Sequence, residues 1–130
     1  MKIMVGYDRS KVAKDAIELA KKHAKAFDAK VHVLTSLAQS SDLQLEDIQR
    51  AEHELEYETA SLVDDNISCE TQAIVSLLSP GEDLVQFAEE NEIDEIVIGV
   101  RRRSKVGKLI FGSTAQFVIL NAPCPVISVK

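Results

Sequence analysis

Residues able to bind an anion are concentrated in one segment, residues 96–115, with the sequence IVIGVRRRSKVGKLIFGSTA. It holds three of the chain's five glycines and five of its fifteen Lys and Arg residues. Glycine lets the backbone approach an anion closely, and guanidinium groups bind phosphate through paired hydrogen bonds. The rest of the chain is acidic, and the formal net charge is −6. The segment therefore predicts a site for a polyanion, with an ordinary basic surface loop as the alternative.

The end of this segment is expected to open a helix at Gly112 and Ser113. The free N–H groups and partial positive charge of a helix N-terminus favour an anion, whereas the simpler alternative is a helix cap at Ser113. The segment is not a Walker A loop, because Leu109 rather than Ser or Thr follows Gly107 and Lys108. A dinucleotide-binding fingerprint would follow the first strand, so that motif is excluded too.

Strand and helix patterns alternate along the whole chain. Short apolar or β-branched runs predict strands at residues 3–6, 30–36, 69–75, 93–99 and 125–129. Between them, apolar residues at helical spacing predict four helices, on which the stripes are Ala13, Ile17, Ala20, Ala24 and Phe27; Ile48, Leu55 and Leu62; Leu84, Phe87 and Ala88; and Ala115, Val118 and Ile119. This order predicts a single α/β domain over residues 1–130, with an open five-stranded parallel sheet covered by helices on both faces (Rossmann-like).

Two of the predicted strands end in unusual loops. GYDRS follows the first strand, and the glycine-rich basic segment follows the fourth. Open parallel sheets bind ligands beyond the carboxyl ends of their strands, where strand order reverses. If the first and fourth strands are neighbours, both loops line one crevice. Asp8 is then a candidate ligand, with an N-cap or Asx-turn as its structural alternative and Ser10 as another cap candidate.

Composition and charge limit the classes of function. Residues 42–65 carry nine carboxylates and one basic residue, Arg50, and residues 82–95 carry seven carboxylates and no basic residue. We interpret these runs as solvated helix faces; they argue against general nucleic-acid binding, which needs a basic face. No secretory leader or membrane span is expected, and a cytoplasmic location is the default. Cys69 and Cys124 match no metal or disulfide spacing, and we expect reduced core residues.

Four segments of the chain together resemble the universal stress protein family, over essentially its whole length. They are YDRS after the first strand, SPGEDLVQFAEENEIDEIVIG, the glycine loop ending in GS, and the terminal NAPCPVISV. The family's nucleotide-binding branch carries glycine, two residues, glycine, nine residues, and then glycine with Ser or Thr. Gly99, Gly112 and Ser113 match this spacing, but Arg102 occupies the second glycine position. Its side chain would either fill the phosphate space or supply a charge there.

The resemblance implies an adenine nucleotide alpha hydrolase-like fold and an adenine nucleotide, ATP or AMP, as ligand. Mg²⁺ bridging the phosphates is a further expectation, since Mg²⁺ prefers phosphate oxygens and water. Asp8 would bind the nucleoside, and the residues around it would contact the base, the ribose or the phosphates. By position, the implied site consists of Gly6, Tyr7, Asp8, Ser36, Ile98, Gly99, Arg101, Arg102, Gly112, Ser113, Thr114 and Ala115.

Three functions remain open at this stage. The first is a nucleotide-binding regulatory or stress-response module without rapid turnover. The second is a homodimeric protein-interaction module that has lost nucleotide binding; the resemblance implies a homodimer in either case, paired through Val126–Val129, an apolar edge that would otherwise be exposed. The third is slow ATP hydrolysis or autophosphorylation, for which the nearest hydroxyls are Ser104, Ser113 and Thr114. His23, His32 and His53 fall on predicted helices and a strand, where we do not expect them to act as a general base.

Overall fold

The computed structural model describes residues 1–100 and 112–130. The segment between them contains Arg101, Arg102, Arg103, Ser104, Lys105 and Lys108, so the predictions made for these residues lie outside the described part of the chain. In chain order the elements are β1 (Lys2–Gly6), α1 (Lys11–Phe27), β2 (Lys30–Ala38), α2 (Leu45–Asp64), β3 (Cys69–Ser76), α3 (Pro80–Glu90), β4 (Glu95–Gly99), α4 (Ser113–Asn121) and β5 (Val126–Val129).

The five strands form one parallel sheet in the order β3-β2-β1-β4-β5. β1 lies at the centre, with Gly6 in register with Leu34 of β2 on one side and with Ile98 of β4 on the other. The chain winds outward from β1 through β2 to β3 and then returns to the opposite side for β4 and β5. Strand order therefore reverses between β1 and β4, which confirms the predicted fold and the predicted neighbours.

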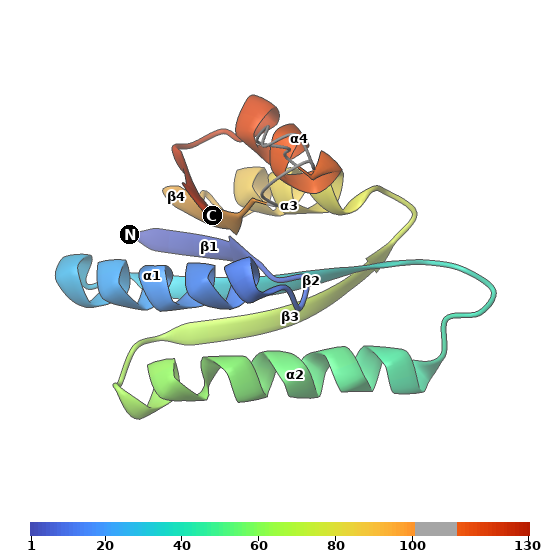
Figure 1. The fold of residues 1–130 in the computed structure, drawn as a ribbon, viewed down its shortest axis with the longest axis horizontal. Helices are drawn as coiled ribbons and strands as arrows, with labels where there is room; N and C mark the ends of the chain where they lie inside the picture. Colours follow the sequence, from blue (N-terminus) through green and yellow to red (C-terminus); the bar gives the residue numbers. More distant parts are fainter. Residues whose placement is uncertain (101–111) are drawn as a thin grey trace, which may run out of the picture.

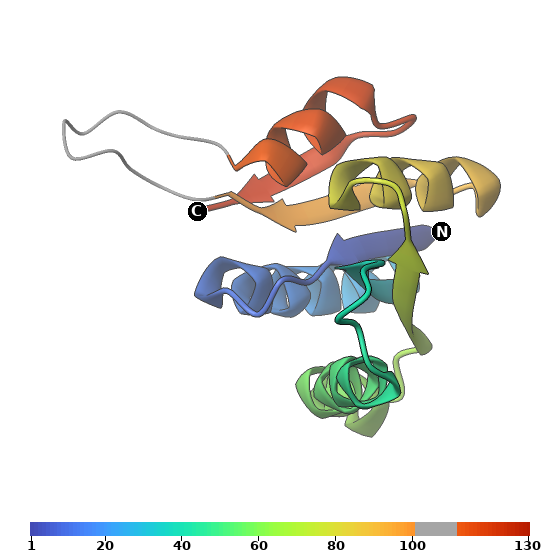
Figure 2. The ribbon, with the colours of Figure 1, turned by 90° about the vertical axis from the view of Figure 1, so that its right-hand side faces the viewer.

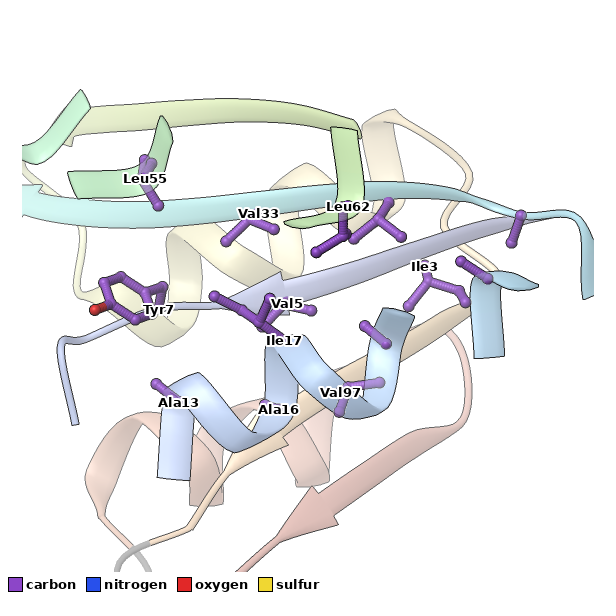
Figure 3. Packing of buried hydrophobic residues seen from close by; sticks show 14 residues of the cluster. Ile3, Val5, Tyr7, Ala13, Ala16, Ile17, Val33, Leu55, Leu62 and Val97 are labelled. Atoms are coloured by element: carbon purple, nitrogen blue, oxygen red, sulfur yellow. The ribbon is translucent and has the colours of Figure 1, made fainter. Parts of the chain in front are cut away.

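Helices cover both faces of the sheet. Figure 2 shows α1 and α2 on one face and α3 and α4 on the other, and Figure 1 shows the same layers from the side. The α1 and α2 face buries Val5, Ile17 and Leu55 among others, as Figure 3 shows. The second core, beneath α3 and α4, contains Met4 and Val118. Both faces of the central strand are thus buried, as its uninterrupted apolar sequence requires.

Local sequence explains where the helices begin. Ser10 is the N-cap of α1, and its Oγ accepts a hydrogen bond from the Ala13 N–H at 3.1 Å. α3 begins with Pro80 after a capping box in which Ser79 and Glu82 bind each other's backbone N–H groups. The N-cap of α4 is Gly112 and the helix begins at Ser113, so the alternative that placed the cap at Ser113 was off by one residue. In the described part of the chain no side chain caps this helix start.

The other differences from the sequence predictions are small. β4 begins at Glu95 rather than at residue 93, whereas β2 extends to Ala38, because its pairing with β3 continues past Ser36. Cys69 and Cys124 are free thiols, but each is half-buried against a core rather than fully inside it. Burial raises the pKa of both thiols. Among the described residues, no helix is both long and apolar enough to cross a membrane.

Candidate functional site

A cavity of about 670 Å³ lies at the carboxyl ends of β1, β2 and β4. Its walls also include the first turns of α3 and α4 and part of α2. Every predicted site residue within the described part of the chain lines this cavity: Gly6, Tyr7, Asp8, Ser36, Ile98, Gly99, Gly112, Ser113, Thr114 and Ala115. Residues predicted from four separate segments of the sequence are therefore brought to one place, although their roles toward a ligand stay predictions.

Two glycines at the cavity also lie in close contact with neighbouring helices. A Cβ on Gly99 would lie 2.7 Å from Val12 Cγ2 and 2.8 Å from the Val12 carbonyl carbon, so α1 packs directly on this backbone. A Cβ on Gly6 would meet Leu84 Cδ1, the end of a flexible side chain, at 2.8 Å. Contact with the α1 backbone is thus a reason for glycine at Gly99, separate from any approach of a ligand, whereas at Gly6 the Leu84 side chain can rotate away.

Asp8 lies on the exposed turn between β1 and α1. Its Oδ1 accepts hydrogen bonds from the Ser10 N–H at 3.0 Å and from the Ser10 hydroxyl at 2.5 Å. This is the Asx-turn that the sequence offered as an alternative, and Ser10 rather than Asp8 caps the helix. The two roles are compatible, because the turn engages only one carboxylate oxygen. Within residues 1–100 and 112–130 the other oxygen makes no hydrogen bond, so it could accept from hydroxyl groups of a ligand.

Tyr7 is mainly a core residue. Its side chain is 6% exposed and packs with the cluster beneath α1 and α2, as Figure 3 shows. Its N–H donates to the Leu34 carbonyl at 2.8 Å, and its carbonyl accepts from Thr35 Oγ1 at 3.0 Å. Burial, together with the nearby carboxylates of Glu58 and Glu54, raises the pKa of the phenol. The side chain of Tyr7 thus has a packing role, and its main chain holds the first turn against β2.

Ser36, near the end of β2, is hydrogen-bonded to a buried carboxylate. Its hydroxyl donates to Asp83 Oδ2 at 2.6 Å, and the hydroxyl of Ser76 donates to Asp83 Oδ1 at 2.7 Å. Asp83 lies in the first turn of α3 and is 5% exposed. Sequence reasoning missed Asp83, because a carboxylate in a helix's first turn is ordinary and nothing in SPGEDLV indicates burial.

The start of α4 lies at the cavity with backbone N–H groups that its own helix leaves unpaired. The N–H groups of Ser113, Thr114 and Ala115 have no acceptor within their own helix, because the first intrahelical bond runs from Gln116 N–H to the Gly112 carbonyl at 3.0 Å. These three residues line the cavity. The helix start therefore offers hydrogen-bond donors and a partial positive charge to a negatively charged group.

Charged side chains of the cavity wall were missed by the sequence analysis. Arg9 lines the cavity from a left-handed backbone position, with φ 70°, and its Nε lies 2.6 Å from Glu54 Oε2. Arg50 of α2 also lines the cavity, 3.7 Å from Asp47 Oδ1. The position of Arg9 directly after Asp8 was the available signal, and Arg50 is the one basic residue within a long acidic run.

The histidines on α1 and β2 lie away from the cavity. His23 Nδ1 is 2.7 Å from Glu95 Oε1, at the amino-terminal end of β4. His32 is buried in β2 and contacts the Phe87 ring edge-on. Neither lines the cavity. In residues 1–100 and 112–130, no group of three or more His, Cys, Asp or Glu side chains is placed to hold a metal ion.

Comparison with known proteins places the chain in a family. The model of the universal stress protein family matches residues 1–130. A universal stress protein of Mycolicibacterium smegmatis is 31% identical, covering 98% of this chain and 96% of its own length. A solved universal stress protein of Archaeoglobus fulgidus is 37% identical, with a TM-score of 0.89 over 100% of this chain and 98% of that one.

A further structure is that of the universal stress protein from Archaeoglobus fulgidus in complex with dAMP. It is 32% identical, with a TM-score of 0.84 over 100% of this chain and 98% of that one. The family match over the full sequence and the agreement in fold lead to the same assignment. The chain belongs to the universal stress protein family.

Proposed function

We propose that this protein binds an adenine nucleotide, AMP or ATP, in the cavity at the carboxyl ends of β1 and β4, and acts in regulation or stress response rather than rapid catalysis. The observation that carries the proposal is the meeting of Asp8 and the open N-terminus of α4 in one cavity of about 670 Å³. A relative 32% identical to this chain has been solved with dAMP. That complex supports an adenine nucleotide as the ligand class.

The described residues suit the two chemically different ends of a nucleotide. The N–H groups at the start of α4 would donate hydrogen bonds to the phosphate, where each exposed contact stabilises by about 0.3–1 kcal/mol. The carboxylate oxygen of Asp8 that is not engaged by Ser10 would accept hydrogen bonds from ribose hydroxyls. Micromolar affinity requires about 8 kcal/mol, so both ends and the base must contribute together. Binding of Mg²⁺ stays a prediction for a nucleotide with several phosphates, such as ATP, because Mg²⁺ prefers phosphate oxygens.

Thermal melting with and without AMP, dAMP and ATP tests the proposal. A ligand at a hundred times its dissociation constant stabilises by about 2.7 kcal/mol, which corresponds to roughly 10 °C for a chain of this size. The shift should shrink strongly in Asp8→Ala. It should persist in the matched control Asp15→Ala, which removes a carboxylate that pairs with Lys11 on α1 outside the cavity. No saturable shift with any of these nucleotides at millimolar concentration would overturn the proposal.

The homodimer stays a separate proposal. β5 lies at one edge of the sheet, pairs with β4 on its inner side, and has half-buried Val126, Ile127 and Val129. A second copy paired along this edge would cover these side chains and the open backbone groups. Sedimentation or light scattering measures the mass directly. A mass equal to that of one chain at micromolar concentration would refute the dimer without affecting nucleotide binding.

A further inference from the structure

The hydrogen bond between Ser36 and Asp83 fixes the direction in which the Ser36 hydroxyl points its hydrogen. Ser36 lines the cavity, whereas Asp83 lies behind the cavity wall and is 5% exposed. The Ser36 hydroxyl donates to Asp83 Oδ2 at 2.6 Å. A hydroxyl group has one hydrogen and two lone pairs. Since the hydrogen is directed at Asp83, the oxygen retains only its lone pairs for a molecule in the cavity.

A second serine holds the carboxylate from its other side. The Ser76 hydroxyl donates to Asp83 Oδ1 at 2.7 Å and accepts from the Leu78 N–H at 2.9 Å. Asp83 therefore accepts on both oxygens, and an ionised carboxylate has no hydrogen to give back to either serine. Among residues 1–100 and 112–130, no donor to Ser36 Oγ is found. The hydroxyl of Ser36 is thus poised as an acceptor.

We propose that Asp83 is a positioning residue that makes Ser36 an obligate hydrogen-bond acceptor, so that the cavity selects a base carrying an amino group at that point. This inference rests on the proposed nucleotide site. The exocyclic amine of adenine can donate to Ser36 Oγ. The keto oxygen of hypoxanthine is itself an acceptor, and two facing acceptors leave both unpaired. A ligand that leaves buried acceptors without a donor binds much more weakly, so AMP should bind about tenfold more tightly than IMP.

Titration calorimetry of AMP and IMP into the full chain tests this selection. In Ser36→Ala the AMP affinity should fall until the two nucleotides bind about equally. In Asp83→Leu the hydroxyl of Ser36 is free to turn and donate, so AMP binding should be kept while IMP binding improves about tenfold. A purely structural role for Asp83 would weaken both nucleotides by the same factor. Ser36→Thr keeps a hydroxyl and should restore the preference for AMP.

Ser76→Ala is the matched control. It removes the same kind of hydrogen bond from the same carboxylate, but Ser76 does not line the cavity, so the ratio of AMP to IMP affinity should stay as in the unaltered chain. The inference would be overturned if AMP binds and the ratio of AMP to IMP affinity is the same in the unaltered chain, in Ser36→Ala and in Asp83→Leu. That result would leave the proposed nucleotide site intact. Absence of AMP binding to the unaltered chain would overturn this inference, and the proposed function would be refuted as well only if dAMP and ATP also failed to bind.

Discussion

Replacing Gly99 by alanine should destabilise the folded protein through its contact with α1, before any ligand is considered. The added Cβ would lie 2.7 Å from Val12 Cγ2, 2.8 Å from the Val12 carbonyl carbon and 2.9 Å from its oxygen. Two of these atoms are backbone, so the helix itself must move away by about 0.6 Å to reach ordinary contact, and close-packed interiors resist such shifts. Overpacking costs about 1–3 kcal/mol, and we expect the upper part of that range.

Gly6→Ala is the natural comparison, because the added Cβ would meet the mobile end of Leu84 rather than backbone. Rotation of that side chain relieves the contact, and alanine is better than glycine in a strand by about 0.5–1 kcal/mol, so the net change should be small. Thermal unfolding without nucleotide measures both variants. The Gly99→Ala midpoint temperature should fall by roughly 8–12 °C. Equal stability of Gly99→Ala and the unaltered chain would refute packing against α1 as a reason for this glycine.

Two further predictions concern stability. Burial lowers the pKa of His32 from 6.5, and the nearby Glu70 carboxylate opposes this only in part. As pH falls, the imidazole therefore binds a proton more readily in the unfolded chain than in the folded chain. The free energy of unfolding should therefore decrease as pH falls through 6.5. Urea unfolding between about pH 5 and 8 measures this decrease, which should be shallower in His32→Leu. The same dependence of the free energy on pH in both chains would contradict the prediction. Ser10→Ala removes the cap bond to the Ala13 N–H and should cost about 1 kcal/mol in the same assay, whereas a change within error would argue that Asp8 takes over the cap.

The fold was predictable because each local signal agreed with the global arrangement. Strand-like runs alternated with helical stripes, and a parallel sheet is the arrangement that such crossovers allow. Ser10 and the Ser79–Pro80 pair marked helix starts by their own chemistry. The exact ends were less predictable, since pairing with a neighbour rather than local sequence decides how far a strand such as β2 extends.

The candidate site was predictable only in part. Asp8 and Gly112 followed from the loops at the ends of β1 and β4, because strand ends at a reversal of strand order converge. Asp83 could not be found in this way, because its partners are not indicated by local sequence. Ser36 of β2 is distant in the chain, and Ser76 of β3 belongs to no motif. The contact of Gly99 with Val12 was equally hidden, because helix approach is a property of the packed structure.

The central position of β1 has a kinetic consequence. β1 meets β2 across a short stretch of chain, Gly6 opposite Leu34, but meets β4 only when Gly6 finds Ile98. The longer loop, about 92 residues against 28, costs about 1 kcal/mol more closure entropy. Partly folded chains with only β1 to β3 formed would lack the cavity walls that α3, β4 and α4 supply. A molecule bound in the cavity should therefore slow unfolding without speeding formation of the first three strands. It would stabilise the pairing of β1 with β4, which forms last.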